Sequence, residues 1–120
     1  VQRFAEADGY LVGSPVYFGS ATPQTMCLLD RVGYVARCGD NFLRRKAGAA
    51  IVVARRAGQN FTMAQLDYFF LINEMIVPGS TYWNIAFGHK KGEVEGDDEG
   101  VKTVRTLGSN MAWLMKKLES

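Results

Sequence analysis

Two short apolar runs, each followed by a longer segment with helical periodicity, constrain the fold of this 120-residue chain more than any other feature. Residues 9–14 (GYLVGS) end at Pro15, and residues 49–54 (AAIVVA) end at a pair of arginines. Runs of this length without a polar face are typical of strands that are buried on both sides of a parallel sheet. The chain is long enough for one core and too short for two ordinary ones, so we expect a single domain over residues 1–120.

The first and last helices have clear end signals. We expect a helix over residues 23–37, because Thr22 can cap it and its first residue is a proline, whose missing N–H costs nothing there. Gly39 is expected to end that helix. Residues 98–118 carry apolar side chains at steps of three and four, and they begin with acidic residues that the helix dipole favours.

Between them, the sequence predicts a helix that begins at Thr62. Thr62 and Gln65 have the spacing of a capping box, and Phe61 and Leu66 have the spacing of a hydrophobic staple. Residues 1–7 have the character of the last turn of another helix that leads directly into the first strand.

A third strand is expected at residues 75–77, just before Pro78. Residues 82–87 have two interpretations, since they can continue that strand after an excursion or form an edge strand. Alternation of strands and helices with right-handed crossovers gives an α/β fold with helices on both faces of a parallel sheet. We therefore predict a doubly wound parallel sheet in three α/β/α layers.

Open parallel sheets bind ligands outside the carboxyl ends of their strands, which directs attention to the loops after the first two strands. Adjacent aromatic rings, a glycine and a helix N-terminus suit a planar heteroaromatic ligand, although the rings can equally plug the edge of the domain. In the second loop, a glycine permits close backbone approach and two arginines can face an anion, or they can simply be solvated. The candidate residues are Ser14, Pro15, Val16, Tyr17, Phe18, Gly19, Ser20 and Ala21 in the first loop, and Arg55, Arg56, Ala57, Gly58 and Gln59 in the second.

Two segments of the chain carry a family resemblance. ADGYLVGSPVYFGSATPQTMCLLDR and GAAIVVARRAGQNFTMAQLDYFFLINEMIVPGSTYWN resemble consecutive segments of the NADPH-dependent FMN reductase and iron-sulfur flavoprotein group, a branch of the flavodoxin-like superfamily. The resemblance implies FMN, with its isoalloxazine ring between the two loops. It also implies NADPH or NADH as electron donor and a quinone, flavin or similar small molecule as acceptor. A non-catalytic electron carrier for protein partners is the alternative.

The same resemblance implies a homodimer or homotetramer in which a neighbouring subunit helps to close the flavin site. Tyr82 and Trp83 are candidates for that contact, against ordinary packing at the edge of the sheet. In this group the first strand and the phosphate-binding loop precede the segment that matches Ala7, as does the cysteine motif of iron-sulfur flavoproteins. We expect this N-terminal βα portion to be missing here, so no residue is assigned to the FMN phosphate.

The remaining reactive side chains have ordinary interpretations. Cys27 and Cys38 lack the spacing of a metal or cluster site, and we expect Cys27 to pack as a small apolar side chain. His89 is expected to be a solvated loop residue, although it can meet a substrate.

Bulk composition excludes several partner classes. The net charge is +2 and the basic residues are scattered, which does not favour nucleic acid. The longest apolar stretch, residues 68–77, is too short and too polar to cross a membrane. Nothing resembles a signal peptide, so we expect a cytoplasmic protein.

Overall fold

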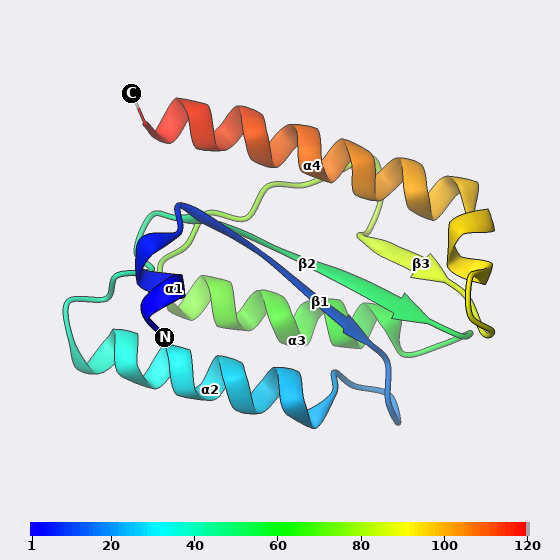
Figure 1. Ribbon diagram of the computed structural model, residues 1–120, viewed down its shortest axis with the longest axis horizontal. Coiled ribbons are helices and arrows are strands. Elements are labelled where there is room, and N and C mark those ends of the chain that lie inside the picture. The colour runs from blue at the N-terminus through cyan, green and yellow to red at the C-terminus, as the bar shows by residue number, and fades with distance from the viewer. Residues whose placement is uncertain (120) are drawn as a thin grey trace.

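A computed structural model of the chain describes residues 1–119 and contains a parallel sheet with helices on both faces (Figure 1). The strands lie in the order β1-β2-β3, with α2 and α3 on one face and α4 on the other. The predicted three-layer α/β/α arrangement is confirmed. The elements are α1 (Gln2–Glu6), β1 (Gly9–Pro15), α2 (Pro23–Cys38), β2 (Ala47–Ala54), α3 (Gln59–Ile72), β3 (Ile85–Phe87), the 3-10 helix η1 (Glu93–Gly96) and α4 (Asp98–Leu118).

The third strand differs from the prediction. Ile76 makes only an isolated parallel bridge to Ala47, and the strand proper starts at Ile85, which pairs with Val52. Both contacts lie along the same edge of β2, so the chain leaves this edge after Ile76 and returns to it. Pro78 provides the physical reason, because a proline cannot donate a hydrogen bond to the neighbouring strand.

Local capping explains the two helix starts that the sequence predicts correctly. Thr22 caps α2 by accepting a hydrogen bond from the amide of Thr25 at 3.2 Å. Asp97 does the same for α4, accepting from the amide of Gly100 at 3.1 Å. Such caps satisfy amides that have no partner inside the helix.

The predicted start of α3 at Thr62 is wrong. The helix begins at Gln59, after Gly58, and the Thr62 side chain is fully buried inside it. Gln65 does not complete a capping box, because its Oε1 accepts a hydrogen bond from the amide of Ala21 at 2.9 Å. The contact of Gln65 with Ala21, a residue far away in the sequence, therefore replaces the local capping-box contact that the spacing of Thr62 and Gln65 predicted.

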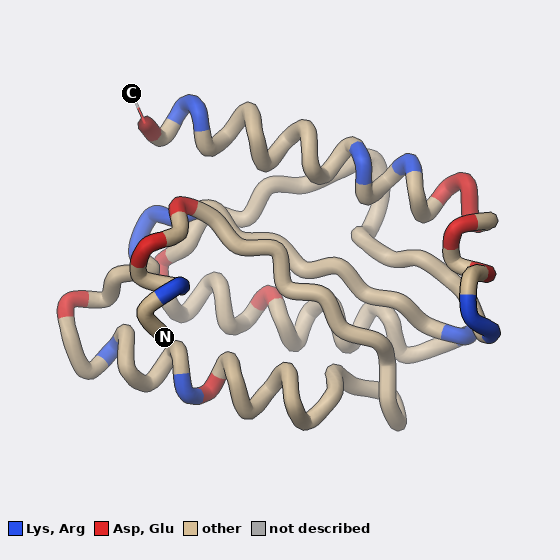
Figure 2. The backbone as a smooth tube through the Cα atoms, viewed as in Figure 1, with Lys and Arg blue, Asp and Glu red and all other residues tan. Residues whose placement is uncertain are grey.

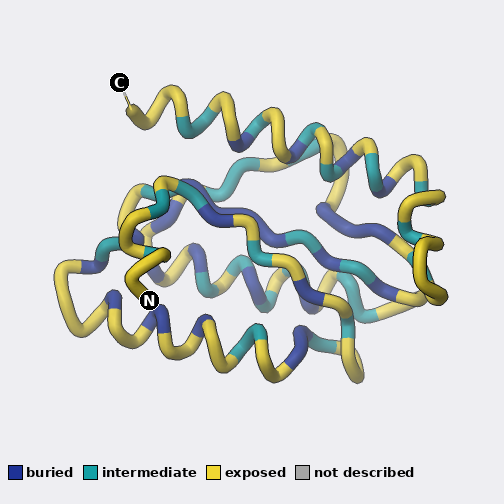
Figure 3. The backbone as a smooth tube through the Cα atoms, viewed as in Figure 1, coloured by how far each residue is buried: buried dark blue, intermediate teal, exposed yellow. Residues whose placement is uncertain are grey.

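Two apolar clusters lie on opposite faces of the sheet, as the buried segments in Figure 3 show. Leu29, Val32, Leu66 and Phe70 are buried between β1, β2 and the α2–α3 layer. On the other face, small alanines of β2 pack under Leu107 and Met111 of α4.

β1 was predicted to be buried on both faces, but one of its faces is largely exposed. α4 packs on β2 and β3, so the α4-facing side chain of Leu11 in β1 remains 51% exposed. Cys27 was predicted to pack as an apolar residue, but it lies on the outer side of α2 and is exposed. Its helical position points away from the buried stripe that contains Leu29 and Val32.

The N-terminal helical turn predicted before the first strand is present as α1. Lys46 holds its end by donating to the carbonyl of Ala5 at 2.7 Å, and the Tyr10 hydroxyl donates to the carbonyl of Phe4. Burial, together with the nearby Asp8 carboxylate, raises the pKa of Tyr10 to about 12.

Candidate functional site

The loops that follow β1 and β2 meet at the carboxyl edge of the sheet. The amide of Val16 donates to the carbonyl of Val53 at 2.9 Å, which continues the strand pairing into the first loop. Gly58, in the second loop, has φ +88, and a Cβ added there would lie 2.7 Å from Val16 Cγ1 and 3.1 Å from Gly19 Cα. Only glycine fits this conformation and this space, so the two loops form one surface.

The tip of the first loop is a tight two-residue turn. Tyr17 and Ser20 exchange backbone hydrogen bonds of 2.8 and 3.1 Å, while Phe18 and Gly19 have φ of 48 and 81 degrees. Positive φ at both central residues is the signature of a type I′ turn. Within residues 1–119 the amides of Phe18 and Gly19 have no acceptor, so both can donate to a ligand.

Phe18 is unusual in two respects. Its side chain is fully exposed, and a bulky residue with positive φ is a conformational outlier. Strain of this kind collects at ligand-binding sites, where the surrounding structure holds it in place. A ring presented in this way can cover a ligand that sits on the loop surface.

The base of the first loop is fixed by three hydrogen bonds. Ser14 Oγ accepts from the amide of Thr22 at 3.1 Å and donates to the carbonyl of Pro15 at 2.8 Å. Gln65 provides the third contact, from α3 to the amide of Ala21. Sequence reasoning assigned Gln65 to a cap and missed this role. Its position two turns after Gly58, on the side of α3 that faces α2, is the signal that could have found it.

Positive charge gathers at the same edge. The N-cap of α3 is Gly58, which has no side chain to cap the helix, so the first amides of α3 and the positive end of its dipole face the loops. Arg55 and Arg56 are exposed there. Figure 2 shows these arginines at the end of β2, close to the basic pair that follows β3. The edge is therefore suited to a ligand with negative charge.

A third loop joins this edge. The amide of Gly88 donates to the carbonyl of Ala54 at 3.1 Å, which holds the turn after β3 beside the start of the second loop. His89 lies exposed in that turn, as predicted, and its backbone amide donates to Glu93 Oε2 at 2.8 Å. A hydrogen bond from the Lys90 amide, together with this one from His89, lowers the pKa of Glu93.

The residues present fit the ring system of a flavin. Gln59 Oε1 is buried without a hydrogen-bond partner among the described residues. Together with the two free turn amides, it offers both acceptor and donor groups, which a heterocycle with carbonyl oxygens and an N–H can use. A buried polar atom without a partner is costly in the free protein, and a ligand can remove that cost.

Tyr82 lies beside the start of α4, and Trp83 lies beside the first turns of α3. Their rings are 4.8 Å apart, and both side chains are about half exposed. Trp83 lines a cavity of about 280 Å³ together with Asn60 and Asp67 of α3. Burial raises the pKa of Asp67, and its Oδ1 has no partner within residues 1–119.

No group of three or more His, Cys, Asp or Glu side chains in residues 1–119 is placed to hold a metal ion. None of the helices in that part of the chain is both long and apolar enough to cross a membrane.

Sequence comparison gives consistent relatives. Over 99% of its length the chain is 38% identical to an iron-sulfur flavoprotein of Methanocaldococcus jannaschii, of which it covers 64%. A second iron-sulfur flavoprotein of that organism is 38% identical over 82% of the chain and 54% of the relative. One from Methanosarcina thermophila is 31% identical over 98% of the chain and 61% of the relative. The chain thus spans between about half and two thirds of these relatives.

Solved structures show the same fold at low identity. A WrbA-like flavodoxin from Agrobacterium tumefaciens superposes with a TM-score of 0.66 at 15% identity, over 91% of this chain and 71% of that one. RosB with bound 8-demethyl-8-formylriboflavin-5'-phosphate gives a TM-score of 0.74 at 15% identity, over 98% of this chain and 51% of RosB. The fold is therefore flavodoxin-like. Residues 1–90 match the sequence model described as NADPH-dependent FMN reductase, and the chain belongs to that family of flavoproteins.

Proposed function

We propose that the full-length protein binds FMN non-covalently and is an NAD(P)H-dependent oxidoreductase. The observation that carries the proposal is the joined loop surface, where the amides of Phe18 and Gly19 have no acceptor within residues 1–119. The buried Oε1 of Gln59, the residue after Gly58, also has no partner there. Bound FMN would take a hydride from NADPH or NADH and pass electrons to a quinone, a flavin or a similar acceptor. Membership of the FMN reductase family supports this reading.

The chain's own residues have distinct parts in this proposal. Tyr17 and Phe18 flank the ring, while Gly58 lets the second loop approach it closely. Arg55, Arg56 and the N-terminus of α3 stabilise negative charge on the reduced ring, which raises its reduction potential. We assign no residue of this chain to the phosphate group of FMN.

Tyr82 and Trp83 extend the proposal to a neighbouring subunit. Large aromatic side chains that remain half exposed are common anchors at protein interfaces. We propose that they contribute to closing the flavin site in a homo-oligomer, as the family resemblance implies.

The ring contacts are tested by replacing Tyr17 with alanine. Loss of an aromatic stacking partner costs about 1 to 3 kcal/mol in comparable stacked sites, so we expect FMN affinity to fall roughly 5- to 150-fold. Tyr68, an exposed tyrosine of α3, gives a matched control that should leave FMN affinity unchanged. Equal losses at Tyr17 and Tyr68 would contradict the assignment of the first loop.

A second candidate is a non-catalytic electron carrier, which the similarity to iron-sulfur flavoproteins favours. Anaerobic mixing of the full-length FMN-loaded protein with NADPH or NADH separates the two. For the reductase, we expect the flavin absorbance to bleach in one two-electron step and a quinone to restore it. Bleaching by a low-potential protein donor, but by neither nucleotide, would establish the carrier instead. A protein that shows no absorbance change on titration with FMN would refute both.

A further inference from the structure

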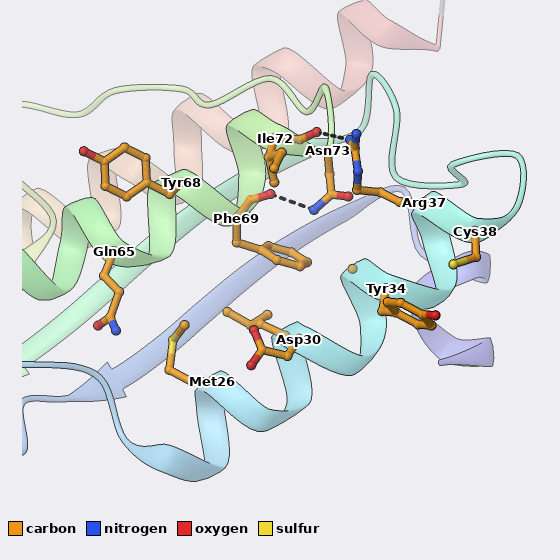
Figure 4. Close-up of a pocket in the computed structure, with 12 residues that line it drawn as sticks. Met26, Asp30, Tyr34, Arg37, Cys38, Gln65, Tyr68, Phe69, Ile72 and Asn73 are labelled. Carbon is orange, nitrogen blue, oxygen red and sulfur yellow. Dashed lines mark hydrogen bonds between the residues drawn. The ribbon is translucent and has the colours of Figure 1, made fainter.

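The two outer layers of the molecule have surfaces of different character. On the outer face of α2 and α3, Tyr34, Tyr68 and Ile72 are more than half exposed around a groove of about 560 Å³ (Figure 4). Asp30 and Arg37 both line that groove, so charges of both signs occur there. The outer face of α4, on the opposite side of the sheet, is basic, and acidic segments appear only near the two ends of the helix (Figure 2).

Basic residues that are scattered in the sequence share one side of α4. Five exposed residues follow one another at steps of three and four, which places them on the same side of a helix. They are Lys102, Arg105, Ser109, Trp113 and Lys116, and we call them the outer stripe of α4. The residues of α4 that are buried against the sheet lie on the other side. The stripe is about 21 Å long, because a helix rises about 1.5 Å per residue.

Acidic residues are confined to the ends of α4. The helix contains no aspartate or glutamate over residues 100–118. The segment beside it, residues 79–82, is also uncharged, and Asn110 Nδ2 holds it there by donating to the carbonyl of Gly79 at 2.8 Å. Glu95 lines a cavity together with Arg105, but within the described part of the chain no ion pair joins them. Lys102 and Arg105 have no ion-pair partner in residues 1–119, so their charges are open to an anionic partner.

Trp113 gives this basic stripe an apolar anchor. Its side chain is 63% exposed, with Arg105 before it and Lys116 after it along the stripe. Tryptophan is enriched at the boundary between water and lipid, because its ring is apolar and its indole N–H is polar. Lysine and arginine together with tryptophan are typical of helices that lie in the plane of a membrane surface. Since the apolar side of α4 is used in the core, this helix can contact such a surface without entering the bilayer.

The shape of the stripe favours a lipid bilayer over a nucleic acid. The stripe lies along the convex outer side of a long helix that forms one whole layer of the molecule (Figure 1). Proteins bind single-stranded nucleic acids in a positively charged groove, where several aromatic side chains stack on successive bases. α4 has one aromatic residue, Trp113, and its outer side is a ridge. A bilayer with anionic headgroups presents negative charge in a plane, which a straight basic ridge can contact along its whole length.

We propose that the outer stripe of α4 binds the surface of a membrane that contains anionic phospholipids, with the Trp113 indole at the level of the headgroups. α4 then lies parallel to the plane of the membrane. The loops after β1 and β2 lie at the carboxyl edge of the sheet, beyond the end of the stripe, so this contact leaves them open (Figure 1). The contact itself does not rest on the proposed function. One consequence does rest on it, because a quinone acceptor dissolves in the same membrane to which the protein binds.

The charges of the stripe are tested by replacing Lys102 and Arg105 together with alanine in the full-length protein. Each basic residue near an anionic surface contributes about 1 kcal/mol, so vesicle affinity should fall roughly 30-fold. Co-sedimentation with vesicles of phosphatidylcholine and phosphatidylglycerol measures that affinity, and vesicles of phosphatidylcholine alone should bind weakly. The matched control replaces Arg3 and Arg31, exposed residues of α1 and α2, with alanine. It removes the same charge from elsewhere on the protein and should leave vesicle affinity nearly unchanged.

The anchor is tested by tryptophan fluorescence. When anionic vesicles are added, the emission of the wild-type protein should shift to the blue and be quenched by brominated lipids, and Trp113→Phe should abolish both changes. Raising the salt concentration from about 0.1 M to about 1 M shortens the range of the stripe's charges from about 10 Å to about 3 Å, so vesicle binding should be lost. Thermal unfolding verifies that every variant folds.

The proposal is overturned if the wild-type protein does not sediment with anionic vesicles at low salt. It is also overturned if the two double variants lose affinity equally, or if Trp113→Phe leaves the fluorescence changes intact. Binding to oligouridylate but not to vesicles, lost on replacement of Lys102 and Arg105, would assign the stripe to nucleic acid instead. Flavin absorbance, recorded on the same samples, tests the proposed function separately. A colourless protein that sediments with vesicles refutes that function alone, and a yellow protein that stays in solution refutes this contact alone.

Discussion

Replacing Gly58 with alanine tests the contact between the loop after β1 and the loop after β2. The added Cβ would lie 2.7 Å from Val16 Cγ1, and the residue would have to keep φ +88. A left-handed conformation costs about 1 to 2 kcal/mol for a residue with a side chain, and overpacking costs about 1 to 3 kcal/mol more. We expect the free energy of unfolding to fall by roughly 2 to 5 kcal/mol.

The same substitution should weaken FMN binding. The clash can relax only if the turn around Gly19 moves away from the second loop, and that turn carries the amides assigned to the flavin ring. We expect at least tenfold weaker binding, which corresponds to about 1.4 kcal/mol. Urea unfolding of the FMN-free protein measures the first effect, and titration with FMN measures the second.

Two other glycines serve as controls for Gly58→Ala. Gly92 has φ +86 but no atom within 4 Å of an added Cβ, so Gly92→Ala isolates the conformational cost. Gly13 of β1 has ordinary φ, and its added Cβ would lie 3.8 Å from the nearest atom, so Gly13→Ala should change stability little. If Gly58→Ala is no worse than Gly92→Ala and leaves FMN affinity unchanged, the steric argument for a joined loop surface is refuted.

Three further predictions concern the site and the flank of α3. Phe18→Asn should raise the free energy of unfolding of the FMN-free protein by up to about 1 kcal/mol in urea, because asparagine tolerates positive φ. The same substitution should weaken FMN binding. A lower free energy of unfolding would count against strain at Phe18. Replacing Arg55 and Arg56 together with alanine should lower the two-electron potential of bound FMN by roughly 40 mV. Each nearby exposed charge contributes about 1 kcal/mol, and 30 mV corresponds to about 1.4 kcal/mol. An unchanged potential in spectroelectrochemistry would exclude both arginines from the site. Burial raises the pKa of Asp67, so its ionisation destabilises the fold as pH rises above the unfolded value of 3.8. Asp67→Asn should therefore be more stable than wild type at pH 7, with an advantage that disappears on acidification, whereas a constant difference across pH would refute the burial argument.

The sequence predicted those features of the fold that depend on residues close together in the chain. Thr22 and Asp97 cap their helices within four residues, and the helix starts at these positions were predictable. The capping-box spacing at Thr62 was equally local but was overridden, because Gln65 bonds to Ala21 across 44 residues. No pattern within one segment contains such a contact.

The meeting of the two candidate loops at one edge was predictable, but the conformation of the first loop was not. In a parallel sheet the carboxyl ends of neighbouring strands lie at the same edge, so the loops that follow them are brought together. The type I′ turn at Phe18 was not predictable, since a phenylalanine disfavours the positive φ that this turn requires. The sequence also did not predict that the third strand is divided between Ile76 and Ile85. Each of the two segments has the pattern of a short strand, and only their pairing with the same edge of β2 shows that they belong together.

The hydrogen bonds at the base of the first loop have a consequence for how this fold can be altered. Ser14 Oγ and the Thr22 amide close the loop at 3.1 Å, and Gln65 anchors its exit, so the two ends of the loop are held by groups outside the turn at its tip. The residues of the tip can therefore be replaced while these hydrogen bonds keep the two ends of the loop in place. Tips of other lengths or chemistries can be grafted between Pro15 and Ala21, and a library of such grafts would select new ring ligands without redesign of the domain.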